Sequence, residues 1–164
     1  MINILLAEGF SCQRDLIKNI KASDYMSRLK VFACHSQNRL DVFKYADGVK
    51  IIDRKSALND EHFIQQYLDY CTQEHIHVVI TGQHTKLFEK HRSKFEEKEI
   101  VFYNGAKGVQ NHIDMDDKLA FTARCLANDL PVVPAYKFTS RAEFEALHAE
   151  KTQQYGVMAV KPAK

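Results

Sequence analysis

Short polar segments with glycine follow three apolar runs of this chain, and their residue types suit the binding of a small molecule. The residues of interest lie in these segments or at the start of the next helical pattern: Glu8, Gly9, Arg14, Gly82, Gln83, His84, Asn104 and Gly105. In an α/β sheet the carboxyl ends of parallel strands meet at one edge, where ligands bind. We therefore expect a small-molecule cleft at this edge, with plain helix capping as the alternative for the two later segments.

The first of these segments does not have the pattern of a dinucleotide-binding loop. It contains one glycine, Gly9, in place of the three glycines of a G-x-G-x-x-G sequence. Glu8 would also direct a carboxylate at the position that a pyrophosphate occupies in such loops. Arg14 lies in the first turn of the next helix and could reach an anion, but a solvated arginine on a helix face is the simpler interpretation. The sequence therefore disfavours dinucleotide binding.

The cysteines and histidines do not form a metal-binding pattern. Cys71, His75 and His77 are close in sequence, but His75 would end a helix and His77 would begin a strand, so their side chains need not converge. A second pair of ligands that would complete a tetrahedral zinc site is missing nearby. The four cysteines include no CxxC pair and are interpreted as reduced thiols. We expect no metal site within this chain.

Apolar runs alternate with helical patterns through the first hundred residues. The runs predict strands over residues 2–7, 29–34, 49–52, 77–81 and 100–103, and the helical spacing falls over 12–21, 40–45, 61–74 and 85–95. The runs lack alternating polarity, which is typical of strands buried on both faces. We therefore predict an α/β fold with a Rossmann-like, doubly wound parallel sheet.

The organisation changes within residues 105–112, where we place a domain boundary. Asp114 is expected to cap a helix that runs to about residue 128, with Asp117 as an acidic residue of its first turn. Ser140 and Glu143 have the spacing of a capping box and predict the start of another helix.

Two short strands are also expected in this second region, over residues 136–138 and 157–160. The predicted domains are thus 1–108 and 109–164, the second being incomplete.

Composition and charge favour a folded protein without a polyanionic partner. The 164 residues are 45% hydrophobic and 27% charged, with a net charge of +2. This balance gives no reason to expect binding to nucleic acid or to an acidic membrane. The first apolar run is too short for a signal peptide, and no later run reaches membrane length. We expect a cytoplasmic protein whose exposed strand edges invite self-association into a homo-oligomer.

Three features of the last fifty residues occur in the order found in a known superfamily. Asp117 and Lys118 lie near a helix start, residues 130–134 read Leu-Pro-Val-Val-Pro, and an apolar run ends in Lys161 and Pro162. This series resembles the opening of the ATP-grasp fold, in which a Rossmann-like pre-ATP-grasp domain comes first. The resemblance implies that residues 1–108 are the pre-ATP-grasp domain and that the rest is the opening α+β segment of the ATP-grasp domain.

The same resemblance implies an ATP-dependent, ADP-forming ligase, most similar to the carbamoyl-phosphate-synthetase-like branch. In this superfamily a carboxylate receives the γ-phosphoryl group of ATP, and an amine or similar nucleophile displaces the acyl phosphate. Lys118 and Lys161 match the two lysines that contact the nucleotide, and as compact cations they suit a polyphosphate. ATP, Mg²⁺ and a small-molecule carboxylate are the implied ligands, and no catalytic residue is assigned.

Two departures from the superfamily pattern bear on this interpretation. Asp129 stands where a glycine is usual, which should leave the ATP site unchanged. Up to Lys164 there is no counterpart of the glycine-rich loop, the adenine-binding segment or the acidic and Asn residues that hold magnesium. We therefore expect this chain to be the first portion of a longer enzyme and to be inactive alone.

Two other classes of function remain open at this point. One is a stand-alone Rossmann-like module that binds a nucleotide or sugar nucleotide, which the missing glycines weaken. The other is a receiver-like interaction domain without catalysis, for which only Glu8 and Asp53 could supply the acidic pocket.

Overall fold

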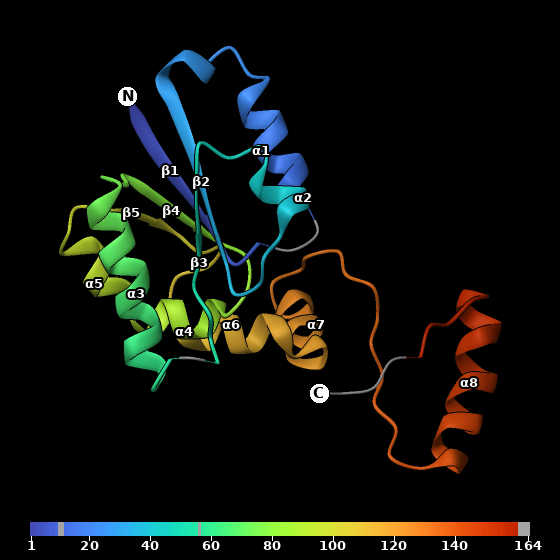
Figure 1. The fold of residues 1–164 in the computed structure, drawn as a ribbon. Helices are drawn as coiled ribbons and strands as arrows, with labels where there is room; N and C mark the ends of the chain where they lie inside the picture. The colour runs from blue at the N-terminus through green and yellow to red at the C-terminus, as the bar shows by residue number, and fades with distance from the viewer. Residues whose placement is uncertain (10–11, 56, 161–164) are drawn as a thin grey trace. The chain divides into compact units, whose positions relative to one another are not determined.

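The first part of the chain is built on a five-stranded parallel sheet (Figure 1). The structure is a computed structural model that describes residues 1–9, 12–55 and 57–160. The strands are β1 (Ile2–Ala7), β2 (Leu29–His35), β3 (Gly48–Ile51), β4 (Val78–Thr81) and β5 (Val101–Tyr103). They lie in the order β3-β2-β1-β4-β5, and each neighbouring pair is parallel. The predicted α/β fold with a parallel sheet is therefore confirmed.

Helices cover the sheet from both faces. The helices of this part are α1 (Gln13–Lys21), α2 (Leu40–Phe43), α3 (Asp60–Gln73), α4 (Thr85–Lys90) and α5 (Arg92–Glu96), with a short 3-10 helix at Met26–Arg28. One core joins Leu5 and Ala7 of β1 to α3, α4 and α5. The other core joins Leu6 of β1 to α1 and α2. Alternate residues of β1 therefore face opposite layers, as the period of a strand requires.

The helical pattern over residues 85–95 forms two helices instead of the single helix expected. His91 separates α4 from α5, with a φ of −109° and a ψ of 15° that lie outside the helical range. Its ring is buried, and its Nδ1 lies 3.6 Å from Oε2 of Glu61 on α3. Phe88 and Phe95, on either side of the break, both pack into the α3-side core. The break thus allows α4 and α5 to place one aromatic ring each in the same core.

The edge strands are less buried than their apolar sequences suggest. Val101 and Tyr103 of β5 are 64% and 62% exposed, whereas Phe102 between them is buried. Val49 and Ile51 of β3 are also exposed. An edge strand has a neighbour on one side only, so an apolar run there does not establish burial of both faces.

The contacts divide the chain into two compact units, Met1–His112 and Ile113–Lys164. The helix α6 (Val109–Asp116) crosses this boundary, and the second unit contains α7 (Lys118–Leu126) and α8 (Arg141–Tyr155). The single helix expected from Asp114 to about residue 128 is therefore wrong, because α6 ends at Asp116 and α7 begins two residues later. Asp117 is the N-cap of α7, not a residue of a first turn.

The N-terminus of α8 has the capping interactions that its sequence predicts. The Ser140 hydroxyl accepts a hydrogen bond from the Glu143 N–H at 3.2 Å. The Glu143 carboxylate accepts from the backbone N–H and the hydroxyl of Thr139, at 2.7 and 2.9 Å. The reciprocal bond of a capping box is thus made one residue earlier than in the standard arrangement.

The two short strands expected in the second unit do not form within the part of the chain that the structure describes. Residues 136–138 and 157–160 have no strand assignment, and Val157 is 90% exposed. A strand requires backbone hydrogen bonds to a neighbour, which apolar residues alone do not supply. In residues 1–9, 12–55 and 57–160, no helix is both long enough and apolar enough to cross a membrane.

Candidate functional site

The loops after β1 and β4 meet at the carboxyl edge of the sheet. β1 and β4 are hydrogen-bonded neighbours in the middle of the sheet. The chain continues from β1 to β2 on one side and from β4 to β5 on the other. A Cβ added to Gly82 would lie 2.8 Å from the Glu8 carbonyl oxygen and 2.9 Å from the Gly9 Cα. Gln83 Nε2 lies 3.4 Å from the Gly9 carbonyl oxygen. Four of the residues expected at the cleft are thus brought together where a doubly wound sheet reverses its strand order.

Glu8 has a fully buried carboxylate at this edge. Its φ of 50° lies in the left-handed region, which an ordinary residue adopts rarely. The hydroxyl of Tyr67 on α3 donates to Glu8 Oε1 at 2.6 Å. Burial and the charge of Glu8 raise the pKa of the Tyr67 phenol well above its usual value, so the phenol stays protonated and remains a donor. The sequence pattern did not identify Tyr67, because it is one of several apolar-face residues of α3.

His84 and Arg54 both contact the ring of Phe63. Arg54 was not among the predicted site residues. His84 is exposed, has a left-handed φ of 52° and precedes α4. Its ring lies edge-on to Phe63 at 5.8 Å, and the Arg54 guanidinium lies 4.9 Å from the centre of the Phe63 ring. Arg54 also pairs with Asp60. The Arg54 guanidinium and the His84 imidazole therefore both lie beside α3.

Asn104 uses its whole side chain to hold the segment after β5. Its Nδ2 donates to the Thr85 carbonyl oxygen at 2.9 Å and to Glu89 Oε2 at 3.0 Å. Its Oδ1 accepts from the Thr81 hydroxyl. Both amide hydrogens are therefore committed. His112 Nε2 lies 2.9 Å from the Ala106 carbonyl oxygen and donates to it, because a carbonyl oxygen can only accept.

Glu89 is the anionic centre of this network. Arg92 contacts both of its carboxylate oxygens, at 2.9 and 2.8 Å, and the Gly108 N–H donates at 2.6 Å. Burial would raise the pKa of Glu89, but Arg92, Gly108 and Asn104 outweigh it and bring the pKa to about 2. The segment that contains Gly105 is therefore anchored at both of its ends. Gly105 itself is exposed with a φ of +74°.

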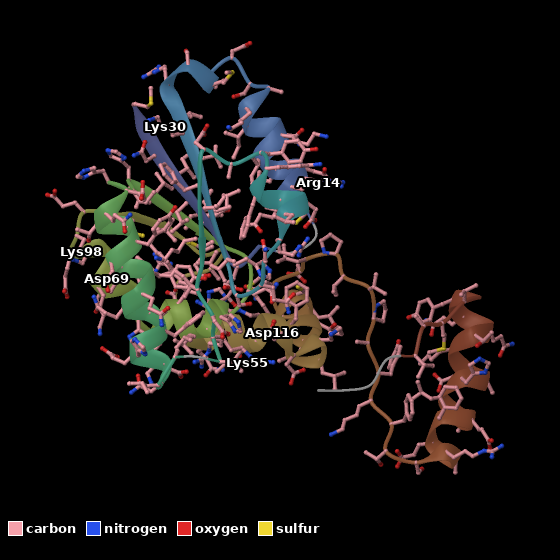
Figure 2. All side chains as sticks on the ribbon, viewed as in Figure 1. Arg14, Lys30, Lys55, Asp69, Lys98 and Asp116 are labelled. Atoms are coloured by element: carbon pink, nitrogen blue, oxygen red, sulfur yellow. The ribbon has the colours of Figure 1, made fainter. Side chains whose placement is uncertain are left out.

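Arg14 lies on the surface of α1 and pairs with a neighbour on the same helix (Figure 2). Its Nε lies 2.9 Å from Asp15 Oδ1, and both side chains are about half exposed. Asp53 is the second acidic residue of the receiver-like alternative. Its Oδ1 accepts a hydrogen bond from the Lys55 N–H at 2.8 Å, which stabilises the turn that follows β3.

The second unit contains a cavity of about 530 Å³. Lys118, at the start of α7, lines this cavity and is exposed. The rings of Phe138, Phe144 and His148 form a continuous row along it, with centroids 5.0 and 5.5 Å apart. The remaining lining residues are Leu119, Pro134, Ala135, Tyr136, Lys137, Leu147, Met158, Ala159 and Val160. A cavity of this size, mostly apolar and lined by two lysines, suits a ligand that combines a flat ring with negative charge. Lys161 lies outside the described residues.

The described residues do not assemble a metal site. Within residues 1–9, 12–55 and 57–160, no three His, Cys, Asp or Glu side chains gather as metal ligands. Cys71 is buried, which raises the pKa of its thiol to about 12. His77 Nδ1 accepts the N–H of Asn3 at 3.1 Å. Cys71 is thus part of the core and His77 is bonded to β1, whereas His75 is exposed.

Comparisons with known proteins identify similar structures only. No family model and no curated protein sequence matches the chain. The biotin carboxylase domain of a single-chain bacterial carboxylase is similar over 93% of this chain and 35% of its own, with a TM-score of 0.53 and 14% identity. A complete pyruvate carboxylase from Rhizobium etli is similar over 82% of this chain and 13% of its own, with a TM-score of 0.52 and 16% identity.

A third similar structure is described with its ligands. It is the biotin carboxylase domain dimer of the 2-oxoglutarate carboxylase from Hydrogenobacter thermophilus, in complex with MgADP, ADP and bicarbonate. It covers 90% of this chain and 32% of its own, with a TM-score of 0.51 and 17% identity. These comparisons show that the chain shares a fold with part of biotin carboxylase domains, and that it spans about a third of their length.

Proposed function

We propose that this chain is part of an ATP-dependent, ADP-forming ligase of the ATP-grasp type. The observation that carries the proposal is the position of Lys118. This lysine matches a nucleotide-contacting lysine of the ATP-grasp pattern, and it lines the aromatic cavity of the second unit. The fold shared with biotin carboxylase domains supports the same class of activity.

In the proposed reaction a carboxylate oxygen attacks the γ-phosphorus of ATP, and the bond to the β-phosphate oxygen breaks to release ADP. An amine or similar nucleophile then attacks the acyl phosphate and releases inorganic phosphate. Lys118 and Lys161 would neutralise the phosphates, and the cavity rings would contact the base. The edge of the first unit, with Glu8, Gly9, Gly82, Gln83 and His84, would hold the second substrate.

Magnesium ligands are not assigned to this chain. The described residues offer no group of three ligating side chains, so the residues present do not fit a complete Mg²⁺ site. The closer relationship to the carbamoyl-phosphate-synthetase-like branch, and assembly into a homo-oligomer, belong to the proposal and rest on the sequence resemblance and on the exposed edge strands.

The test is an NMR titration of the 164-residue chain with ATP, because NMR detects weak binding. Two lysines and one cavity supply part of a nucleotide site, so we expect a Kd of about 1 mM or weaker, or about −4 kcal/mol at most, and no ATP hydrolysis. The replacements Lys118→Met and Lys161→Met should each weaken binding about tenfold. Lys98→Met, at an exposed lysine on the first unit (Figure 2), is the control and should bind as the unchanged chain does.

The same titration distinguishes the main alternative. Shifts that map to the edge around Glu8 and Gly82 instead of the cavity would support a nucleotide-binding module in the first unit. Binding that survives replacement of both lysines would contradict the ATP-grasp proposal.

A further inference from the structure

Two lysines from different helical segments converge on one tyrosine ring in the first unit. Lys18 lies on α1, whereas Lys44 and Tyr45 directly follow α2. The Nζ atoms of Lys18 and Lys44 lie 5.3 and 5.0 Å from the centre of the Tyr45 ring, so the two nitrogens are at most about 10 Å apart. An aromatic ring attracts each cation separately, but the two cations repel each other. Their convergence therefore requires an explanation beyond the ring.

The carboxylates of this surface are bound to other cations. The pairs are Arg14–Asp15, Arg39–Asp41 and Lys21–Asp47, at 2.9, 2.9 and 2.7 Å. Neither Lys18 nor Lys44 lies within ion-pair distance of a carboxylate in the part of the chain that the structure describes. The surface between α1 and α2 thus carries two positive charges that the protein itself does not pair.

Arg14 is the cation of α1 that the sequence offered as an anion contact (Figure 2). Its guanidinium donates to both carboxylate oxygens of Asp15, at 2.9 and 3.4 Å, so its charge is already matched. Lys18 lies one helical turn later on the same face of α1 and has no such partner among the described residues. The anion contact expected at Arg14 is therefore better supplied by Lys18.

Both ammonium groups can be reached from solvent, and the ring between them is held in place. Lys18 and Lys44 are exposed. Tyr45 is half-buried and packs against the core on the α1 side, and its backbone N–H donates to the Val42 carbonyl oxygen at 3.1 Å. A fixed ring that attracts both ammonium groups restricts the space that they sample. The two charges are therefore kept close together at the surface.

We propose that the surface between α1 and α2 binds a small diphosphate anion between Lys18 and Lys44, beside the ring of Tyr45. An ammonium contacts a phosphate oxygen at about 2.8 Å, and the flexible lysine stems let both groups converge on one anion. A diphosphate suits the site better than a carboxylate, because it offers several negative oxygens that two cations can share. The site lies within the first unit, and the inference is independent of the proposed ligase activity.

The test is an NMR titration of the 164-residue chain with pyrophosphate at constant ionic strength and without nucleotide. Saturable shifts are expected at the amides around Lys18 and Tyr45, and acetate should bind about tenfold more weakly or not at all. Lys18→Gln and Lys44→Gln should each weaken pyrophosphate binding about fivefold. Lys30→Gln removes one positive charge from an exposed position on β2 (Figure 2) and should bind as the unchanged chain does.

Absence of saturable shifts around α1 and α2, or equal binding of acetate, would overturn the inference and leave the contacts with the ring as the whole role of the two lysines. Unchanged affinity in both Lys18→Gln and Lys44→Gln would overturn it as well.

Two further measurements separate this site from other phosphate sources. Sedimentation with phosphatidylglycerol vesicles that is lost in Lys18→Gln would assign the surface to lipid headgroups and overturn the small-anion proposal. Lys118→Met should leave pyrophosphate binding unchanged, whereas shifts that map to the second unit and disappear in this variant would place the anion in the cavity instead. Failure here therefore leaves the result of the ATP titration intact, and failure of ATP binding leaves this result intact.

Discussion

The hydroxyl of Tyr67 on α3 donates to Oε1 of Glu8 at 2.6 Å, and both side chains are completely buried. By the alternation of β1, Glu8 would follow Leu6 toward α1, but its left-handed backbone redirects the carboxylate toward α3. The bond therefore joins a strand end to the helix on the opposite layer, across 59 residues of sequence.

Replacing Tyr67 by Phe should lower the free energy of unfolding by about 1–3 kcal/mol. The substitution removes the donor and leaves the Glu8 carboxylate buried without a partner among the described residues. Tyr70→Phe is the matched control, since Tyr70 is a buried tyrosine of the same helix whose hydroxyl makes no hydrogen bond with the described residues. Urea unfolding of both variants measures the difference. Equal effects would show that Glu8 does not depend on Tyr67.

Replacing Glu89 by Gln should destabilise the first unit by about 3 kcal/mol. The substitution leaves Arg92, whose side chain is 14% exposed, without its bidentate partner. Glu96→Gln removes a second, half-exposed carboxylate from the same Arg92 and should cost about 0.5 kcal/mol or less. Thermal unfolding of the two variants compares them. A larger effect of Glu96→Gln would contradict the central place of Glu89.

The pKa of Glu89 predicts a loss of stability in acid. The folded value of about 2 is lower than the ordinary value of 4.5, so folding favours the ionised form. The resulting stabilisation is fully present above about pH 4.5 and is lost as the pH falls toward 2. It amounts to about 3 kcal/mol for this difference in pKa. Urea unfolding between pH 5 and pH 2 should show this loss in the unchanged chain, and the loss should be smaller in Glu89→Gln.

Replacing Asp117 by Ala should destabilise α7 by about 1 kcal/mol. The Asp117 Oδ1 accepts the N–H groups of Leu119 and Ala120 at 2.9 and 3.1 Å, and both would lose their partner. Hydrogen exchange at these two amides should accelerate about fivefold, while exchange in α3 stays unchanged. Asp117→Asn keeps a capping oxygen and serves as the control. Equal acceleration in both variants would mean that charge, not the cap, stabilises this helix start.

The sequence by itself determined the strands, most of the helices and the parallel arrangement of the first unit. Apolar runs such as Ile2–Ala7 and the period of α3 are local signals, because burial on a sheet or on one helix face imposes a repeat within a few residues. The cap at Ser140 was equally local. The sequence did not predict the break at His91, which depends on tertiary packing. It also placed the helix cap at Asp114, whereas α6 continues to Asp116 and the cap of α7 is Asp117, three residues later.

Only the tertiary structure decided what the polar residues at the sheet edge do. The same sequence features placed Glu8, Gly82 and Asn104 in one candidate cleft. Folding placed the Glu8 carboxylate under Tyr67, packed Gly82 against the Glu8 backbone, and bound Asn104 to Glu89. These partners lie 59, 74 and 15 residues away in sequence, beyond the reach of any local pattern. Sequence spacing predicts which residues reach an edge, whereas side-chain direction there depends on backbone conformation and on contacts that form between distant elements.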